Sequence, residues 1–181
     1  MLKARTKRLI REYAESLLIA AVLALIIRTF VVTPFKIPTG SMEPTLMPGD
    51  KIFVSRFIYR FQKPERGDVV VFRYPEDPSR DFIKRLVASG GETIEINNGK
   101  IVINGEIIDH PEIFQKIDYK NRGAYGTAGA QITVPADCYF VLGDNSSSSR
   151  DSRYWGFVPK KLLLGKAFVI WWPPKRIGRI K

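Results

Sequence analysis

The pattern of apolar and polar residues changes once along the chain, close to residue 34. Residues 17–27 form an unbroken apolar run, "LLIAAVLALII", and the apolar character resumes after Arg28 with "TFVV". Beyond Pro34, apolar residues come in short runs separated by prolines and glycines, as in "KIFVSRFIYRF" (51–61) and "GDVVVFRY" (67–74). Short runs rich in β-branched and aromatic residues predict strands. The pattern therefore predicts one helix followed by a mostly β domain.

The middle of the chain carries two strong hairpin signals. In "ETIEINNGKIVINGEII" (92–108), alternating apolar residues flank Asn98-Gly99 and Asn104-Gly105, and such dipeptides favour tight two-residue turns. This stretch predicts a β-meander. The segment "DFIKRLVASGG" (81–91) fits a helix or a strand by periodicity, but its strand-like neighbours and the double glycine favour a strand. "GKAFVIWWPP" (165–174) predicts one more strand.

The apolar run near the front is interpreted as a membrane anchor. Crossing a bilayer takes about 20 residues in a helix, which residues 13–33 supply if Glu15 and Arg28 lie near the ends. A cleavable signal peptide is a second interpretation, but Arg28, Phe30 and valines stand where small residues would be needed. A buried core helix is a third. Five basic residues precede the run, which predicts a cytoplasmic segment at 1–12 and an extracytoplasmic domain at 34–181.

Composition is consistent with one folded domain and an anchor. The chain has 181 residues, 45% of them apolar and 26% charged, which is typical of a globular protein. The formal net charge of +11 indicates an anionic partner, either nucleic acid or a membrane surface. Much of the excess lies at the two ends of the chain, and no basic stripe interleaved with aromatics is evident, so we expect a membrane and no nucleic acid.

Cysteine and histidine are too rare for several kinds of site. The single cysteine, Cys138, allows no intrachain disulfide, and one histidine, His110, cannot build a metal site with it. We therefore expect no metal and no cofactor. A Ser-His-Asp triad would have to use His110, which lies in a turn-like "IIDHPEI", so a serine paired with a lysine is the alternative for acyl transfer.

Three segments could carry that chemistry, and each has a plainer interpretation. Lys84 stands inside an apolar strand, where burial could lower its pKa, but it could equally protect a sheet edge from aggregation. Ser41 lies in "PTGSMEPTL" (38–46), where a serine is also common for turn reasons. "GDNSSSSRDSRYWGF" (143–157) gathers charged and aromatic residues in a predicted loop, or is a solvated turn with a local salt bridge.

Taken together, these segments resemble those of bacterial type I signal peptidases, membrane-anchored Ser-Lys proteases. The matching stretches, in the family's order, are the apolar anchor, "PTGSMEPTL", "RGDVVVF", "YPEDPSRDFIKRLV" and "GDNSSSSRDSRYWGFVP", and they span most of the chain. The resemblance implies a compact antiparallel β-sheet or partial-barrel catalytic domain of the signal peptidase type, preceded by one N-terminal transmembrane helix. It implies a serine endopeptidase of the bacterial cell membrane that removes signal peptides from exported preproteins after a small-x-small motif.

The resemblance also assigns roles to individual residues. It implies that Ser41 is the nucleophile and Lys84 the general base, and that the Ser41 N–H and the Thr39 hydroxyl form the oxyanion hole. Many relatives have serine where Thr39 stands. Three further residues match positions that orient or support the lysine: Ser149, Asp151 and Arg153.

The implied substrate is an extended peptide added alongside strands. The residues that match the family's shallow apolar pockets, or lie near them, are Phe35, Ile37, Pro38, Met42, Leu46, Ile52, Val71, Phe82 and Ile83. The segment 89–136 is shorter than the large β-domain of some relatives, so we expect a small accessory hairpin region there. The apolar side chains of Phe57, Ile58, Phe61, Trp171 and Trp172 are candidates for a rim that enters the membrane interface, or for ordinary core aromatics.

Two other functions remain open from the residues alone. A self-cleaving repressor-type Ser-Lys protease would share the chemistry, but it would need a DNA-binding domain where this chain has an apolar run. A membrane-tethered β domain that binds a protein partner would leave Ser41 and Lys84 without a catalytic role.

Overall fold

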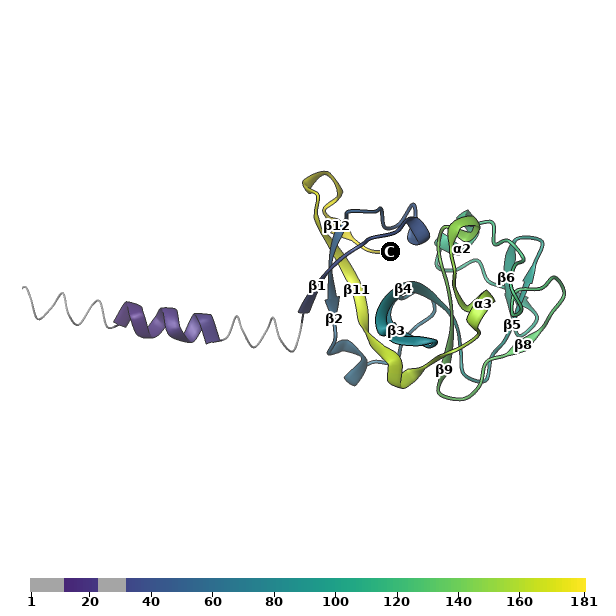
Figure 1. Ribbon diagram of the computed structural model, residues 1–181, viewed down its shortest axis with the longest axis horizontal. Coiled ribbons are helices and arrows are strands. Elements are labelled where there is room, and N and C mark those ends of the chain that lie inside the picture. The colour runs from purple at the N-terminus through teal and green to yellow at the C-terminus, as the bar shows by residue number, and fades with distance from the viewer. Residues whose placement is uncertain (1–11, 23–31) are drawn as a thin grey trace, which may run out of the picture.

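The computed structural model describes residues 12–22 and 32–181 (Figure 1). Residues 12–22 form a helix. None of the helices in these two ranges has both the length and the apolar character that crossing a bilayer requires. Residues 1–11 of the predicted cytoplasmic segment and 23–31 of the predicted anchor lie outside the described residues.

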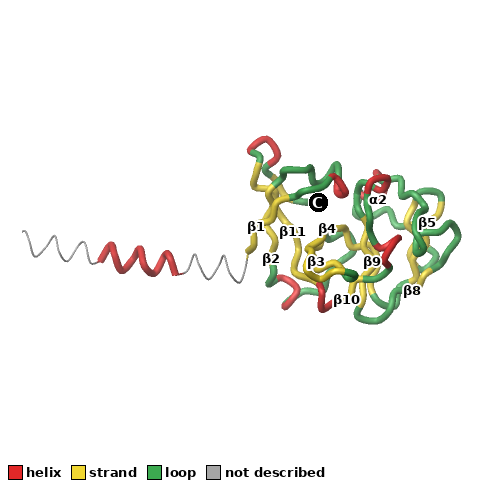
Figure 2. Tube along the Cα trace, in the orientation of Figure 1, coloured by secondary structure: helices red, strands yellow, loops and turns green. Residues whose placement is uncertain are grey.

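Most strands belong to one eight-stranded antiparallel sheet. Its order is β1-β2-β11-β3-β4-β9-β10, and β12 pairs with β11. The pairing is antiparallel throughout, so the predicted mostly β, antiparallel architecture is confirmed. Figure 2 shows that the domain contains strands and loops with only short helical turns. The strands are β1 (Val32–Lys36), β2 (Lys51–Ser55), β3 (Val69–Tyr74), β4 (Asp77–Ser89), β9 (Cys138–Leu142), β10 (Val158–Pro159), β11 (Leu163–Trp172) and β12 (Gly178–Arg179).

A smaller four-stranded sheet lies at the far side of the domain from β1 (Figure 1). Its order is β7-β6-β5-β8, and the chain between β7 and β8 contains the short helix α2. The strands pack through an apolar cluster that also includes Val87 of β4 and Phe140 of β9, so the two sheets share a core. The bounds are β5 (Thr93–Asn97), β6 (Lys100–Ile103), β7 (Glu106–Ile107), α2 (Ile113–Lys116) and β8 (Ile132–Thr133).

Both predicted hairpins are present in this second sheet. Asn97 pairs with Lys100 across the first turn, and Ile103 pairs with Glu106 across the second. The turn residues all have positive φ, at 48° and 76° for Asn98-Gly99 and 52° and 86° for Asn104-Gly105. Asparagine and glycine tolerate this conformation better than other residues, which is why the dipeptides predict the turns. The predicted meander is therefore correct for β5-β6-β7.

Two predicted elements differ from the structure. The expected strand at 51–61 ends at Ser55, and a 3-10 turn, η3 (Ile58–Arg60), follows. The Tyr59 hydroxyl donates to a carboxylate oxygen of Asp68 at 3.0 Å, which draws the chain out of the strand direction. In the expected loop at 143–157, the chain forms η4 (Ser146–Ser148) and the one-turn helix α3 (Ser152–Trp155).

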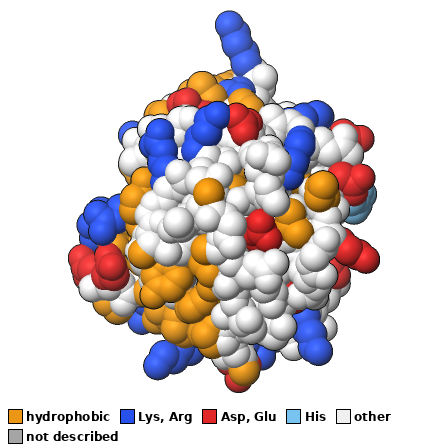
Figure 3. Space-filling view, turned by 90° about the vertical axis from the view of Figure 1, so that its right-hand side faces the viewer, with side chains coloured by type: hydrophobic (Ala, Val, Ile, Leu, Met, Phe, Trp, Pro, Cys, Tyr) orange, Lys and Arg blue, Asp and Glu red, His pale blue; other side chains and the backbone are white. Residues whose placement is uncertain are grey.

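Charged side chains are scattered over the face that carries the second sheet. Figure 3 shows acidic and basic groups interspersed around it, with a large apolar area at the lower left and smaller apolar areas elsewhere. This face therefore presents no single patch of positive charge, although the whole chain is strongly basic.

Candidate active site

Ser41 lies in a rigid turn that follows β1. The turn is the 3-10 helix η2 (Gly40–Met42), and the fully buried side chains of Met42 and Leu46 hold it against the core. Asn145 fastens it from the other side, because its backbone N–H donates to the Ser41 carbonyl and its side-chain amide donates to the Gly40 carbonyl, both at 3.1 Å. The Ser41 side chain is held in place, with only 8% of the residue exposed.

Lys84 approaches this serine from β4. The strand pairs Lys84 with Val70 of β3, in the middle of the main sheet. The Nζ atom of Lys84 lies 2.7 Å from the Oγ atom of Ser41 and 2.9 Å from the carbonyl oxygen of Ile83. It also lies 5.6 Å from the centre of the Phe82 ring. The lysine is therefore an internal residue of the sheet, with 4% of its surface exposed, and not an edge lysine.

The surroundings of Lys84 change its ionisation. Burial lowers the pKa of Lys84 from its ordinary 10.5 to about 8, while the carboxylates of Asp151 and Asp144 oppose the shift. Desolvation penalises the charged form of an amine, so the neutral form becomes accessible near neutral pH. At pH 7 about one molecule in ten would hold the neutral amine, against roughly one in 3,000 for a free lysine. A neutral amine next to a hydroxyl can accept its proton.

Gly143 lies between the two serines of the site. A Cβ atom on Gly143 would lie 2.1 Å from Ser149 Oγ and 2.5 Å from the Ser41 carbonyl oxygen, so only glycine fits here. The Ser149 hydroxyl is buried and has no hydrogen-bond partner among the described residues. A buried hydroxyl without a partner is costly and calls for an explanation. Ser149 thus lies against the same glycine as the Ser41 backbone, with its hydrogen-bonding capacity unused.

Asp151 and Arg153 form a fully buried ion pair behind Ser149. The two Arg153–Asp151 contacts, Nε to Oδ1 and Nη2 to Oδ2, are both 2.8 Å. Asp151 caps α3 and accepts the Gly143 N–H at 3.0 Å, and Arg153 Nη2 donates to the Ser146 carbonyl at 2.9 Å. The pair therefore connects the end of β9, the turn η4 (Ser146–Ser148) and α3.

A second buried ion pair, Arg85 with Asp144, was not predicted. Arg85 Nε and Nη2 lie 2.8 and 2.6 Å from the two Asp144 oxygens, and neither side chain is exposed. The Thr45 hydroxyl also donates to Asp144, at 2.5 Å, which ties this pair to the chain just after Ser41. An arginine in an apolar strand, directly after Lys84, is the sequence signal that could have identified it.

Thr39 directly precedes the η2 turn. Its backbone is extended, with φ −130° and ψ 157°, and its side chain makes no capping hydrogen bond to the turn. The residue is exposed at the surface beside Ser41. Its hydroxyl is therefore free to turn toward a ligand at the serine.

Six of the nine predicted substrate-binding residues line one shallow cavity between β1 and β4. The cavity has a volume of about 50 Å³, and Lys36 and Asp81 complete its lining. The three others have no exposed surface and pack in the core cluster behind it: Met42, Leu46 and Ile52. The six lining residues are Phe35, Ile37, Pro38, Val71, Phe82 and Ile83.

The predicted apolar rim is divided between the two ends of β2. Trp172 is half exposed near Lys51, whereas Phe57 and Phe61 follow Ser55 at the opposite end. Trp171 stacks on Phe53 with its ring centre 5.5 Å away. Within residues 12–22 and 32–181, no three His, Cys, Asp or Glu side chains are grouped so that they could hold a metal ion.

Comparison with known proteins identifies the family. Residues 10–172 match the family described as signal peptidase, peptidase S26. A probable signal peptidase I-2 of Synechocystis is 40% identical over 173 residues, which cover 92% of this chain and 75% of that protein. Signal peptidase I of Aquifex aeolicus is 34% identical over 218 residues, covering 91% and 85%. The chain therefore belongs to the signal peptidase family, peptidase S26, and is a serine endopeptidase.

Proposed function

We propose that this chain cleaves N-terminal signal peptides from exported preproteins, with Ser41 as the nucleophile and Lys84 as the general base. The observation that carries the assignment is the separation of 2.7 Å between Lys84 Nζ and Ser41 Oγ, both buried. A hydroxyl becomes a competent nucleophile when an adjacent base takes its proton. Lys84 meets that requirement, because burial lowers its pKa to about 8.

The reaction proceeds in two acyl transfers. Ser41 Oγ attacks the scissile carbonyl carbon while its proton passes to the neutral Lys84 amine. The C–N bond then breaks, and the Lys84 ammonium gives the proton to the leaving amine, which is the new N-terminus of the mature protein. Lys84 next takes a proton from water, whose oxygen attacks the ester, and returns that proton to Ser41. The signal peptide leaves with a new carboxyl group, which loses its remaining proton to solvent.

Two donors would stabilise the oxyanion of each tetrahedral intermediate. They are the backbone N–H of Ser41 and the hydroxyl of Thr39. The exposed position of Thr39 and the absence of a capping bond from its side chain are consistent with this role. Loss of a single donor of this kind typically reduces kcat by about 100- to 1,000-fold.

Ser149 would hold the lysine during the reaction. Its buried hydroxyl has no other partner among the described residues, and its backbone carbonyl accepts from Arg153 at 3.4 Å. A hydrogen bond from the Lys84 ammonium to Ser149 Oγ would stabilise the charged form that proton transfer from Ser41 produces. Asp151 and Arg153 act through Ser149 and are positioning residues.

The substrate would lie as an extended peptide between β1 and β4, with small side chains at the first and third positions before the cut. The cavity of about 50 Å³ leaves little room for a larger side chain. Phe35, Ile37, Pro38, Val71, Phe82 and Ile83 would contact it. Met42, Leu46 and Ile52 would support those walls from the core.

Membrane attachment completes the proposal. Residues 13–33 would span the bacterial cell membrane once, with residues 1–12 in the cytoplasm and 34–181 on the extracytoplasmic side. The apolar run and the basic residues before it support this arrangement. The partners are then signal peptides and membrane lipid, with neither nucleic acid nor a cofactor.

A preprotein cleavage assay tests the activity. The full chain, reconstituted in lipid, is incubated with a preprotein that carries a small-x-small site, and the products are resolved by mass. Ser41→Ala should leave the preprotein intact, while Ser79→Ala, an exposed serine at the start of β4, should cleave it normally. Normal cleavage by Ser41→Ala would refute the proposed nucleophile.

A further inference from the structure

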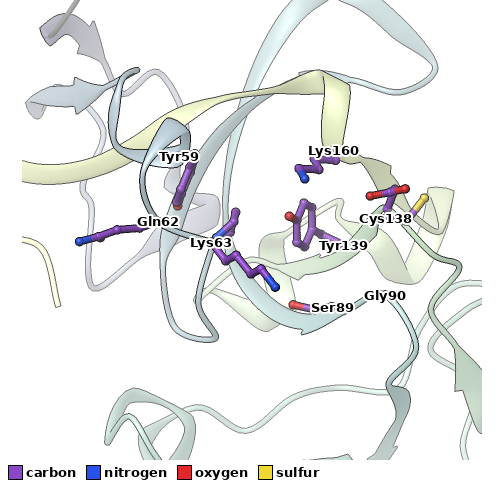
Figure 4. Close-up of a pocket in the computed structure, with 10 residues that line it drawn as sticks. Tyr59, Gln62, Lys63, Ser89, Gly90, Cys138, Tyr139 and Lys160 are labelled. Carbon is purple, nitrogen blue, oxygen red and sulfur yellow. The ribbon is translucent and has the colours of Figure 1, made fainter.

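A second cavity, of about 280 Å³, lies outside the proposed active site. The chain after β2, the end of β4 and the start of β9 surround it, and Figure 4 shows its lining side chains. The polar members of the lining include Lys63, Lys160, Ser89, Tyr139 and Asp137. None of them takes part in the proposed reaction. The proposed peptidase activity therefore leaves this cavity without a role.

The cavity is suited to a phosphate group. Lys63 and Lys160 reach toward it from different walls, with the Tyr139 ring between them (Figure 4). Neither lysine forms an ion pair within the described part of the chain. Burial and the Asp137 carboxylate raise the pKa of Tyr139, so its hydroxyl stays protonated and can donate. Two cations and a hydroxyl donor around one space are a typical environment for a phosphate.

Exposed aromatic side chains lie directly beside this cavity in the chain. Phe57 and Phe61 flank η3, with ring centres 4.8 Å apart, and 74% of Phe61 is exposed. The Arg60 guanidinium lies 5.3 Å from the centre of the Phe57 ring. Aromatic and basic side chains together are typical of surfaces at the headgroup level of a membrane. Lys63 and Gln62 of the cavity follow within two residues of Phe61.

The strand register brings this surface to the end of the domain where the predicted anchor joins it. Val32, the first residue of β1, pairs with Ser55, the last residue of β2. The turn that carries Phe57 and Phe61 starts two residues after Ser55. The chain therefore leaves the predicted anchor at the same end of β2 as Phe57 and Phe61, and the cavity adjoins that turn.

We propose that this cavity binds the headgroup of an anionic glycerophospholipid. The phosphate would lie between Lys63 and Lys160 and accept a hydrogen bond from Tyr139, while the headgroup hydroxyls would donate to Asp137. Phe57 and Phe61 would enter the interface beside it. Two lysines and one carboxylate leave the lining with one net positive charge, which complements a singly charged phosphatidylglycerol. This assignment presupposes the membrane anchoring proposed above.

Lysine footprinting in nanodiscs tests the site. The full chain is reconstituted in phosphatidylcholine discs with or without phosphatidylglycerol, its lysines are acylated, and the modification of each is measured by mass spectrometry. Lys63 and Lys160 should react about fivefold more slowly in the anionic discs, the protection expected for about one lysine–headgroup contact. Lys161, which is exposed and adjacent to Lys160 but outside the lining, should react equally in both.

Any one of three footprinting results would overturn the headgroup site. In the first, anionic discs do not protect Lys63 and Lys160. In the second, they protect Lys161 as much as these two lysines, which would indicate a general surface effect. In the third, millimolar inorganic phosphate in neutral discs protects Lys63 and Lys160 as much as the anionic discs do. Tyr139→Phe should weaken the protection of both lysines, and Lys160→Gln should weaken that of Lys63, whereas Lys161→Gln should change neither.

Preprotein cleavage and co-purification with the discs are measured in the same samples. Cleavage reports the proposed peptidase activity, and co-purification reports the proposed membrane anchoring. A chain that associates with neither kind of disc would overturn the lipid site as well.

Discussion

Lys84 and Arg85 are neighbours in β4, but their side chains reach two different buried partners. Lys84 Nζ lies 2.7 Å from Ser41, whereas Arg85 Nη2 lies 2.6 Å from Asp144. Successive side chains of a strand point to opposite faces, so one strand can serve both contacts. Lys84, the base of the proposed reaction, thus lies in a strand whose next residue, Arg85, is fixed by an ion pair.

Activity should depend on pH through Lys84. Because burial lowers the pKa of Lys84 to about 8 and the neutral amine is the base, kcat/KM should rise with pH, with unit slope, and level off above about pH 8. Cleavage of a peptide substrate from pH 6 to 10 measures this. A profile that is flat between pH 6 and 8 would contradict the role of Lys84 as the base.

Lys84→Met should abolish activity and increase stability. Between the folded pKa of about 8 and the ordinary 10.5, the unfolded state binds more protons, so this lysine destabilises the fold increasingly as pH falls from 10.5 to 8. Below pH 8 the full penalty applies, up to about 3 kcal/mol, and methionine removes it. Thermal unfolding at pH 7 is the measurement, with the exposed Lys100→Met as control. A less stable Lys84→Met variant would show that the lysine's contacts outweigh its burial cost.

Ser149→Ala should separate activity from stability. The hydroxyl has no hydrogen bond in the described structure, so its removal should leave the free energy of unfolding unchanged or raise it by about 1 kcal/mol. If the hydroxyl binds the Lys84 ammonium, kcat should fall about 10- to 100-fold with KM unchanged. Ser148→Ala, an exposed neighbour, serves as the control. An unchanged kcat would remove Ser149 from the mechanism.

Gly143→Ala should inactivate the enzyme by displacing Ser41. The added methyl group would lie 2.5 Å from the Ser41 carbonyl and 2.1 Å from Ser149 Oγ, so the backbone of the site must shift. A displacement of about 1 Å can reduce the rate of an enzyme by about 100-fold. Gly178→Ala is the matched control, since open space surrounds that glycine. Equal activity of the two variants would show that the site tolerates the displacement.

Arg85→Gln should destabilise the domain, because it leaves Asp144 buried without its counter-charge. Breaking a buried ion pair on one side typically costs about 3–5 kcal/mol. Arg66→Gln removes a partly exposed pair with Glu92 and should cost about 1 kcal/mol or less. Chemical unfolding of both variants gives the comparison. Similar losses would mean that the Arg85–Asp144 pair contributes no more than a surface pair.

The parts of the fold that depend on local sequence could be predicted. Asn98-Gly99 and Asn104-Gly105 mark their hairpins, because positive φ at two successive residues is a local requirement. The position of β11 between β2 and β3 could not be predicted, since periodicity shows that a strand exists but not which strand it pairs with. The chain after Ser55 differs from the prediction because Asp68, later in the sequence, binds Tyr59.

The residues of the site likewise divide into those that could be predicted from the sequence and those that could not. The resemblance singled out Ser41 and Lys84, and their side chains lie within hydrogen-bond distance. Arg85 was missed because its partner, Asp144, lies 59 residues further along the chain. The depth of Met42, Leu46 and Ile52 in the core also depends on the three-dimensional packing of β1, β2 and β11, which an apolar pattern alone does not determine.

The position of β11 has a consequence for biosynthesis. Strands β1-β2 and β3-β4 form two separate hairpins, one leading to the serine and the other carrying the lysine, and β11 is the strand that joins them. A ribosome must therefore translate past residue 172 before the two hairpins can be joined in one sheet. In a nascent chain, the serine and the lysine therefore lie in hairpins of separate origin until β11 has been made.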